Sequence, residues 1–336
     1  MKKRNSISAF VVLCLFLAPL SRLRAAAEVK AVPVAGGLCL VEGLEGGNVA
    51  FLVTAEGVLV VDSGTTPEEG RLVVAEIAKQ TDKPVKYLVL THYHGDHTFG
   101  LQAYPATAVI IAQQNTADNI RKLNVPRIQG MMEKQMPEMI AAQKLKVDKL
   151  RKKKNKDLKQ EEERLRTLES KFAELQGLRF VFPVITYDSK LRIYLGGQEI
   201  EVIHPGPAHT NGDSLVFFPG LKTVHMGDLL FIGSYPYIGA EAGCDTANWL
   251  AKVQEASGWD VEKFIPGHGP LAGKEGPLRM AAYLGDLRQA VKAAIAAGQS
   301  LEQAKKMAPL PAWKDLAWPR FFPQNVEAVF NELSKK

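Results

Sequence analysis

The sequence predicts an α/β fold built around a buried sheet. Between residues 38 and 111, short apolar runs alternate with a helical segment, which is the pattern of βαβ units. Similar runs, separated by Gly- or Pro-containing turns, begin again after residue 190. A long charged segment at residues 113–177 interrupts this pattern and predicts an inserted pair of helices.

Local signals place the first elements. Thr66 is expected to cap a helix that reaches about residue 80, because Pro67 suits the first helical position and Glu69 stands where a capping box needs it. Apolar runs predict three strands within residues 38–62, one strand at 85–90 and one near 108–111.

The inserted segment is strongly basic over part of its length. Residues 144–171 contain twelve Lys or Arg against six Asp or Glu. An apolar stripe with heptad-like spacing is formed by Leu158, Leu165, Leu168, Phe172 and Leu175. We interpret the segment as a solvated helical hairpin, since charge runs are mostly solvated. Contact with a partner, a membrane surface or a polyanion through residues 151–154 is the alternative.

The second half of the chain predicts further strands and two helices. Strands are expected at residues 191–195, 199–204, 214–218, 223–226 and 263–265, and helices at 248–257 and 278–297. A main domain at 28–300 would be followed by a helical tail at 301–336. The tail's aromatic residues are expected to pack back on the domain, with a dimer contact as the alternative: Trp313, Trp318, Phe321 and Phe322.

Residues 1–27 are expected to be a signal peptide. A basic start precedes an apolar run at residues 7–20, which is short for a membrane span, and Ala25–Ala27 offers a small-residue cleavage site. Export to a periplasm or the cell exterior follows, without stable membrane insertion after cleavage; an uncleaved anchor is the alternative. Removing these residues takes away five positive charges and no acidic ones, so the net charge falls from +6 to +1. The basic pI is therefore no sign of nucleic-acid binding, and none is expected.

Two cysteines, Cys39 and Cys244, lie outside this leader. They are far apart in sequence and form no disulfide framework, so free thiols are expected even in an oxidising compartment. A bridge between them is the alternative.

The most informative stretch is residues 91–97, Thr-His-Tyr-His-Gly-Asp-His. It follows an apolar strand and places three imidazoles and a carboxylate within six positions: His92, His94, Asp96 and His97. Neutral imidazole and carboxylate are ligands that suit zinc and similar divalent ions. Three later Gly-rich turns add further metal-capable side chains, His209, Asp228 and His268. The sequence therefore predicts a metal site at the ends of several strands.

These residues, with Asp62-Ser-Gly64, resemble the metallo-β-lactamase-fold hydrolase superfamily over about residues 33–295, except the insertion. The resemblance implies a four-layer αββα sandwich with two metals. Carried over by position, one metal would bind His92, His94 and His209. The other would bind Asp96, His97 and His268, with Asp228 bridging the two. Asp62 would orient the ligand loop from behind.

Such a ligand set predicts a hydrolase. Two divalent ions held by this set would still have room to bind water between them. Metal binding lowers the pKa of that water toward ~7, so hydroxide is available to attack a carbonyl or phosphoryl centre. Asp96 could orient this nucleophile and pass its proton to the leaving group. Zinc is the first choice because the set is rich in imidazole and lacks thiolate, with iron or manganese as alternatives.

The substrate is less well specified than the reaction. Members of the best-known β-lactamase subclass carry cysteine at the position of Asp228 and lysine at the position of Phe231. A bridging aspartate is instead similar to glyoxalase II-like thioesterases, lactonases and phosphodiesterases. We therefore expect an exported dinuclear zinc hydrolase acting on a small ester, thioester or lactone. The alternatives are a β-lactamase, a phosphodiesterase or nuclease, and a non-catalytic metal-binding interaction protein.

Four other residues near these motifs have less defined roles. His204 and His225 fall outside the matched positions and are expected to be structural. Tyr235 and Tyr237 follow the turn of Asp228 and are candidates for pocket walls, with ordinary packing equally favoured.

Overall fold

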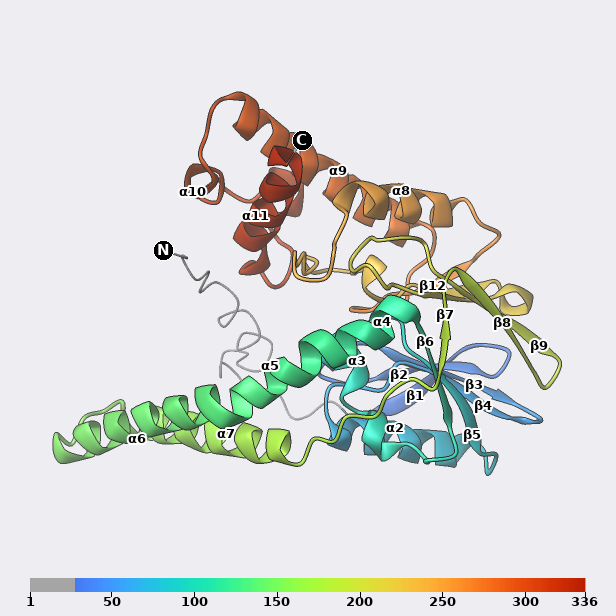
Figure 1. Cartoon of the computed structure of the whole chain (residues 1–336), viewed down its shortest axis with the longest axis horizontal. Coiled ribbons are helices and arrows are strands. Elements are labelled where there is room, and N and C mark those ends of the chain that lie inside the picture. Colours follow the sequence, from blue (N-terminus) through green and yellow to red (C-terminus); the bar gives the residue numbers. More distant parts are fainter. Residues whose placement is uncertain (1–27, 336) are drawn as a thin grey trace. The chain divides into compact units, whose positions relative to one another are not determined.

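The computed structural model describes residues 28–335, so the expected signal peptide at 1–27 lies outside it. Its strands form two sheets (Figure 1). The first has seven strands in chain order: β1 (Lys30–Ala35), β2 (Leu38–Glu42), β3 (Val49–Thr54), β4 (Gly57–Val61), β5 (Val85–Val89), β6 (Val109–Gln113) and β7 (Ile185–Tyr187). The second has five, in the order β12-β11-β10-β9-β8: β8 (Lys190–Leu195), β9 (Gln198–Ile203), β10 (Leu215–Phe218), β11 (Thr223–His225) and β12 (Lys263–Ile265).

Strand direction determines at which edge of each sheet the loops between strands lie. In the first sheet β1 to β4 pair antiparallel, whereas β4, β5, β6 and β7 run parallel. In the second sheet β11 and β12 are the parallel pair. Neighbouring parallel strands end at the same sheet edge, so the loops after β4 and β5, and those after β11 and β12, lie side by side.

The first sheet is buried on both faces, as the nearly continuous apolar runs predict. Along β3, Ala50 and Leu52 join a core between the sheets, which also includes Val202 of β9 and Val216 of β10. The alternate residues, such as Phe51, belong to a second core on the opposite face. This alternation follows from the two-residue period of a strand.

Helices cover the outer face of each sheet, which completes the expected αββα sandwich (Figure 1). Helix α2 (Pro67–Gln80) contributes Val73 and Ile77 to the core on the outer face of the first sheet. Helices α8 (Thr246–Ser257) and α9 (Glu275–Ala296) lie over the second sheet and pack on each other. Shorter helices occur at α3 (Gly95–Thr98) and α4 (Gln114–Asn119).

Residues 125–179 form a compact unit of their own, separate from the unit that contains both sheets. After a π-helical turn, Ile120–Asn124, this unit has α5 (Val125–Gly130), a second π-helical turn (Met131–Gln135), α6 (Met136–Lys152) and α7 (Leu158–Gln176). Helices α6 and α7 pack against each other and are joined by ion pairs such as Lys144–Glu169 and Arg151–Glu162. On α7, two residues of the predicted apolar stripe, Leu168 and Leu175, are buried.

The tail has two helices, α10 (Leu301–Ala304) and α11 (Phe321–Ser334). Helix α11 packs on α9, and Trp313, Phe321 and Phe322 are buried. The described part of the chain has no helix with the length and apolarity needed to cross a membrane. Both Cys39 and Cys244 are free thiols.

Three local expectations need correction. The Thr66 side chain accepts from the Glu69 amide as predicted, but the Glu69 carboxylate accepts from the amides of Thr65 and Glu45, so no reciprocal capping box forms. Strands β1 and β7 were not expected; β7 has three residues, which is too short for an alternating pattern to predict a strand. The insertion as a separate unit begins at 125, because the preceding α4 bonds to the loop of Asn211 and Gly212.

Candidate metal centre

The predicted ligands all lie in segments that follow strands, with Asp96 and His97 in the short helix α3 and Asp228 in a 3-10 turn, Gly227–Leu229. Strand β5 leads into the loop of His92, His94, Asp96 and His97, and the neighbouring parallel strand β4 delivers Asp62 beside it. On the second sheet, β9 precedes His209, while the parallel strands β11 and β12 lead to Asp228 and His268. The sandwich thereby brings together seven side chains from four loops that are up to 176 residues apart in sequence.

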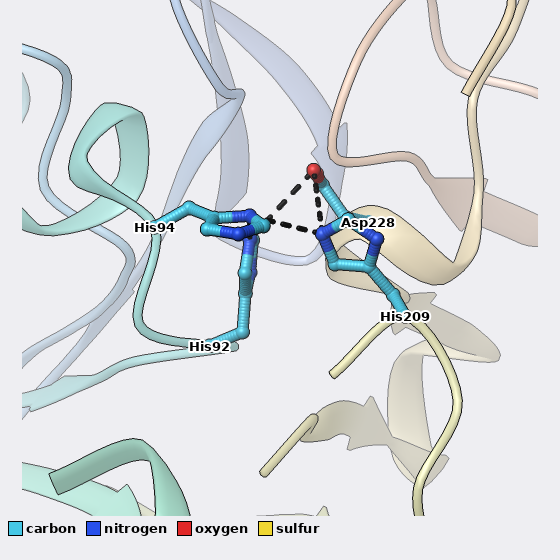
Figure 2. A group of neighbouring side chains, drawn as sticks. All are labelled: His92, His94, His209 and Asp228. Carbon is cyan, nitrogen blue, oxygen red and sulfur yellow. Dashed lines mark hydrogen bonds and ion pairs between the residues drawn. The ribbon is translucent and has the colours of Figure 1, made fainter. Parts of the chain in front are cut away.

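These side chains form two adjoining groups with metal-binding donors. The first comprises His92, His94, His209 and Asp228 (Figure 2), and the second comprises Asp96, His97 and His268. Within each group the donor atoms lie within 4.8 Å of one another. Three imidazoles with Asp228 thus form one group, and two imidazoles with Asp96 form the other.

The spacing in the first group fits a shared ion. The His94 Nδ1 atom lies 3.0 Å from the Nε2 atoms of both His92 and His209. Asp228 Oδ2 lies 3.4 Å from His209 Nε2 and 3.7 Å from His92 Nε2. Ligands bound at zinc distances in a tetrahedron would be about 3.3 Å apart, which these separations bracket.

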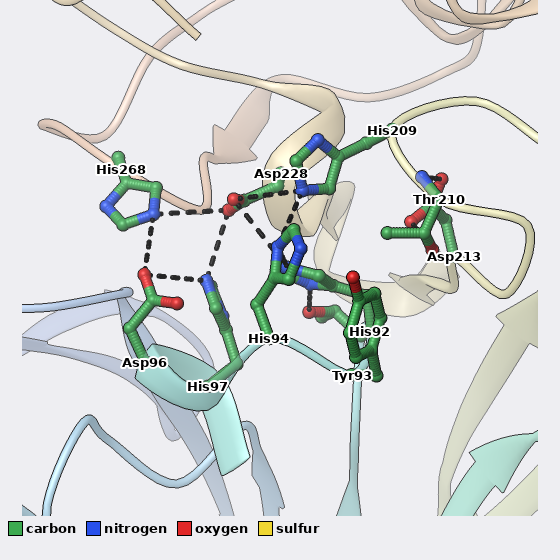
Figure 3. Close-up of polar contacts among 12 residues, drawn as sticks. His92, Tyr93, His94, Asp96, His97, His209, Thr210, Asp213, Asp228 and His268 are labelled. Carbon is green, nitrogen blue, oxygen red and sulfur yellow. Dashed lines mark hydrogen bonds and ion pairs between the residues drawn. The ribbon is translucent and has the colours of Figure 1, made fainter. Parts of the chain in front are cut away.

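Asp228 faces both groups at once (Figure 3). Its Oδ2 atom points to the first group, whereas Oδ1 lies 3.2 Å from His97 Nε2 and 3.4 Å from His268 Nε2. Asp96 Oδ2 completes the second group at 3.2 Å from His268 Nε2. Within the described chain, His97 Nε2 and Asp228 Oδ1 have no hydrogen-bond partner although they are buried. These two buried atoms are in ion-pair contact with each other but make no hydrogen bond, and a bound cation would satisfy both.

Asp62 holds the ligand loop from behind. Its Oδ2 atom lies 2.7 Å from His97 Nδ1, which fixes the ring with Nε2 turned toward the second group. The same carboxylate accepts hydrogen bonds from the amide and hydroxyl of Thr91, at 2.8 and 2.7 Å. Asp62 and His97 are both fully buried. A carboxylate behind a ligating imidazole orients it and raises its basicity.

Two glycines allow the loops to approach this closely. A Cβ atom on Gly267 would lie 2.0 Å from Asp228 Oδ1, and one on Gly47 would lie 2.3 Å from the His97 ring. Any larger residue at either position would push a candidate ligand out of place. Gly267 lies in the Gly-rich turn of His268 noted in the sequence, and both glycines are required for steric reasons.

The two groups differ in their protonation. Burial lowers the pKa of His92 and of His209, which favours the neutral imidazole that binds metals. Burial also opposes charge on His97 and His268, but the carboxylates of Asp228 and its neighbours raise both pKa values, that of His268 to about 9. A cation entering the second group must displace those protons, which couples its binding to pH.

Both carboxylates are in the form that binds a cation. Burial opposes the charge of Asp96 and Asp228, but the neighbouring imidazoles more than compensate and hold both pKa values below the usual range. Asp96 is also the more accessible, with a side chain 11% exposed against 4% for Asp228.

The sequence did not identify several residues that hold these loops. The Asn48 side chain donates to the carbonyls of Pro266 and Gly269, which bracket His268. Trp249 packs edge-on against the His209 ring at 5.2 Å. Phe231 stacks on His268, with ring centroids 5.0 Å apart. These contacts join segments distant in sequence, and no local pattern announces them.

The remaining candidates divide as follows. Tyr237 lies edge-on to His94 at 5.5 Å and borders the site, whereas Tyr235 is buried in the core against Tyr283. His204 and His225 belong to neither group of donors in the described residues. His204 Nδ1 lies 2.7 Å from the Asp213 carbonyl, and the backbone amide of Gly227 donates to His225 Nδ1.

Comparison with known proteins matches residues 43–268 to the metallo-beta-lactamase superfamily. Among curated proteins, the chain is similar to a linear primary-alkylsulfatase of Pseudomonas sp. (23% identity, covering 66% of this chain and 41% of the relative). It is also similar to a type 2 metallo-beta-lactamase of Elizabethkingia meningoseptica (22% identity, 65% and 64%). The chain thus spans less than two thirds of the length of these relatives.

Solved structures share the fold. A stereoselective inverting sec-alkylsulfatase of Pseudomonas sp. has a TM-score of 0.66 at 17% identity, covering 90% of this chain and 50% of that chain. A metallo-beta-lactamase from Pontibacter korlensis has a TM-score of 0.55 at 17% identity, covering 77% and 99%.

Proposed function

This chain belongs to the metallo-beta-lactamase superfamily, and from that premise we propose that it is a dinuclear zinc hydrolase of small carbonyl compounds. The substrate class we favour is an ester, thioester or lactone. The observation that carries the proposal is the position of Asp228, whose two oxygens face separate groups of imidazoles. A complete donor set around a shared carboxylate suits a working site better than a relic.

The proposed roles of the residues follow from their positions. His92, His94 and His209 would hold one ion, and Asp96, His97 and His268 the other, with Asp228 shared. When bound, zinc makes water more acidic and attracts the negative charge that develops on a substrate oxygen. Zinc is preferred because the donors are imidazoles and carboxylates without a thiolate.

Asp96 is the residue best placed to handle the proton. It is the more exposed of the two carboxylates, and its lowered pKa keeps it ionised. In that form it can accept a hydrogen bond from attacking water and direct it toward the substrate. Asp62 keeps His97 oriented throughout, because its carboxylate bonds to the ring nitrogen that faces away from the site.

β-Lactam hydrolysis is a weaker candidate on structural grounds. The aromatic ring of Phe231 stacks on His268 and offers no positive charge to a substrate carboxylate. An alkyl sulfate deserves a place in any substrate survey, because alkylsulfatases are among the similar proteins.

The test is hydrolysis by the zinc-loaded protein across one panel: a lactone, a carboxylic ester, a thioester, a β-lactam, a phosphodiester and an alkyl sulfate. We expect cleavage of a carbonyl ester, thioester or lactone, and a fall of at least ~10²-fold in His94→Ala, which loses a candidate ligand. Cleavage only of the phosphodiester or the sulfate would overturn the substrate class. No cleavage at all, or equal rates in the variant, would overturn the hydrolase assignment.

We also propose that the protein is exported, which rests on the sequence of residues 1–27 alone. N-terminal sequencing of protein recovered outside the cytoplasm should begin near Glu28. Recovery with Met1 intact would contradict cleavage.

A further inference from the structure

The C-terminal segment reaches the candidate metal centre, although it lies beyond the residues matched to the superfamily. The Ala317 amide donates to the carbonyl of Gly233, and the Tyr235 amide donates to the carbonyl of Ala317, each at 3.0 Å. These bonds tie the segment to the loop that follows Asp228. Trp318, the next residue, is thereby placed beside the second group of donors.

Trp318 has an unusual backbone conformation for a bulky residue. Its φ angle is +60°, in the left-handed region that costs L-residues about 1 kcal/mol or more. The hydrogen bonds of Ala317 on one side and the packed ring of Phe321 on the other hold it there. Strain of this kind persists where the surrounding structure imposes it, and it is concentrated at functional positions.

The Trp318 ring differs in its surroundings from the rings of Trp249 and Trp313. The indoles of Trp249 and Trp313 are buried and donate hydrogen bonds to Leu229 and Asp286. Trp318 is only half-buried, and within residues 28–335 its indole makes no hydrogen bond of the kind that Trp249 and Trp313 make. Its ring stands edge-on to His268, with centroids 5.3 Å apart.

Trp318 begins an aromatic row that borders both groups of donors. The Trp318 ring lies 6.0 Å from Phe321, which lies 5.6 Å from Tyr237. Tyr237 in turn stands edge-on to His94 at 5.5 Å and to His209 at 6.3 Å. The row, defined as Trp318, Phe321 and Tyr237, therefore runs from the second group of donors to the first.

We propose that the partly exposed ring of Trp318, with the buried ring of Phe321 packed against it, binds the apolar acyl or alkyl group of the substrate. This inference rests on the proposed hydrolase function and makes Trp318 a specificity-determining residue. An apolar chain that lies on the partly exposed indole would remove apolar surface from water, and each buried methylene favours binding. The polar end of the same ligand would then face the metal-binding side chains. Aromatic rings supply such an apolar surface, and they lose little side-chain conformational entropy when a ligand binds.

The test measures binding rather than turnover. The probes are acetate, butanoate and hexanoate, titrated by calorimetry into zinc-loaded full-length protein. We expect affinity to rise by roughly threefold to fourfold per added methylene, the factor that burial of a methylene gives. Trp318→Gly removes the ring while suiting the left-handed backbone, so the fold should survive, and the gain per methylene should vanish.

Two further variants sharpen the result. Trp318→Phe keeps an aromatic surface and should retain part of the gain. Trp259→Ala is the matched control, since Trp259 is also half-buried but packs on Phe217 of β10, and it should behave as wild type. Equal affinities for the three acids in the wild type, or a full gain in Trp318→Gly, would overturn the inference.

The outcome is separable from that of the hydrolase test. A chain-length gain that depends on Trp318, in a protein that cleaves nothing on the panel, would uphold the apolar site and overturn the hydrolase assignment. Hydrolysis without any chain-length gain would do the reverse.

Discussion

At the scale of single residues, the buried polar groups of the candidate site differ in how they are paired. Asp62 accepts hydrogen bonds from Thr91 and faces His97, so both of its carboxylate oxygens have partners. Asp228 Oδ1 and His97 Nε2, in contrast, are buried without a hydrogen-bond partner in the described chain. This contrast separates residues that support the site from those left open for a cation.

Because of His225, the free energy of unfolding should depend on pH. It is fully buried beside the site, and burial lowers its pKa from 6.5 to about 4. Between those pH values the unfolded chain binds a proton at His225 and the folded chain does not, so this contribution to stability is present above pH 6.5 and is lost as the pH falls. At pH 5 the loss is about 2 kcal/mol.

His225→Asn should remove that contribution, because asparagine does not titrate and its Oδ1 can accept from the Gly227 amide in place of Nδ1. Urea unfolding of metal-free protein at pH 7.5 and pH 5 measures it. The drop in unfolding free energy should be about 2 kcal/mol smaller in the variant than in the wild type. An equal drop in both would mean that His225 is protonated in the fold.

At the scale of elements, local signals predicted most helices and strands but not their partners. Helix α2 begins at Pro67 with Thr66 as its cap, because both signals act within one turn. The Glu69 carboxylate does not bond to the Thr66 amide, because a distant amide, that of Glu45, donates to it instead. Strand β7 was not predicted because its three residues at the edge of the sheet are too few to form a recognisable strand pattern.

The tail shows how an element can stabilise the site loop from a distance. The Asn325 amide of α11 donates to the Pro236 carbonyl and the Tyr283 hydroxyl, and its oxygen accepts from the Ile238 amide. All of these bonds are buried. The loop that carries Tyr237 is therefore fixed by a helix about 90 residues further along the chain.

Asn325→Leu should lower the unfolding free energy by about 2–4 kcal/mol, because it leaves three buried polar groups unpaired. Chemical denaturation measures the change. Gln324→Leu, on the half-buried neighbour, is the matched control and should change stability by less than ~0.5 kcal/mol. Equal effects of the two substitutions would show that the Asn325 bonds are not what holds the tail.

At the scale of the whole molecule, the candidate site could be predicted because every candidate ligand lies in a segment that follows a strand. The sequence marks such positions by an apolar run followed by Gly and His or Asp, and the sandwich then gathers them at one edge. The aromatic row could not be predicted in this way. Trp318 lies 50 residues after His268 and is brought to it only by pairing of Ala317 with the loop of Gly233 and Tyr235.

The sandwich also explains why both sheets are needed for one site. The first sheet supplies His92, His94, Asp96 and His97, and the second supplies His209, Asp228 and His268. Each group of donors contains residues from both sheets. Bound metal would therefore link the two sheets and stabilise the folded chain over the unfolded one.

The most direct test of the central claim is the amount of zinc bound per chain, measured by elemental analysis after reconstitution and dialysis. We expect two zinc ions in the wild type. In Asp228→Asn it predicts at most one, since the shared carboxylate no longer bridges the groups. One ion or none in the wild type, or two in both proteins, would contradict a dinuclear site built around Asp228.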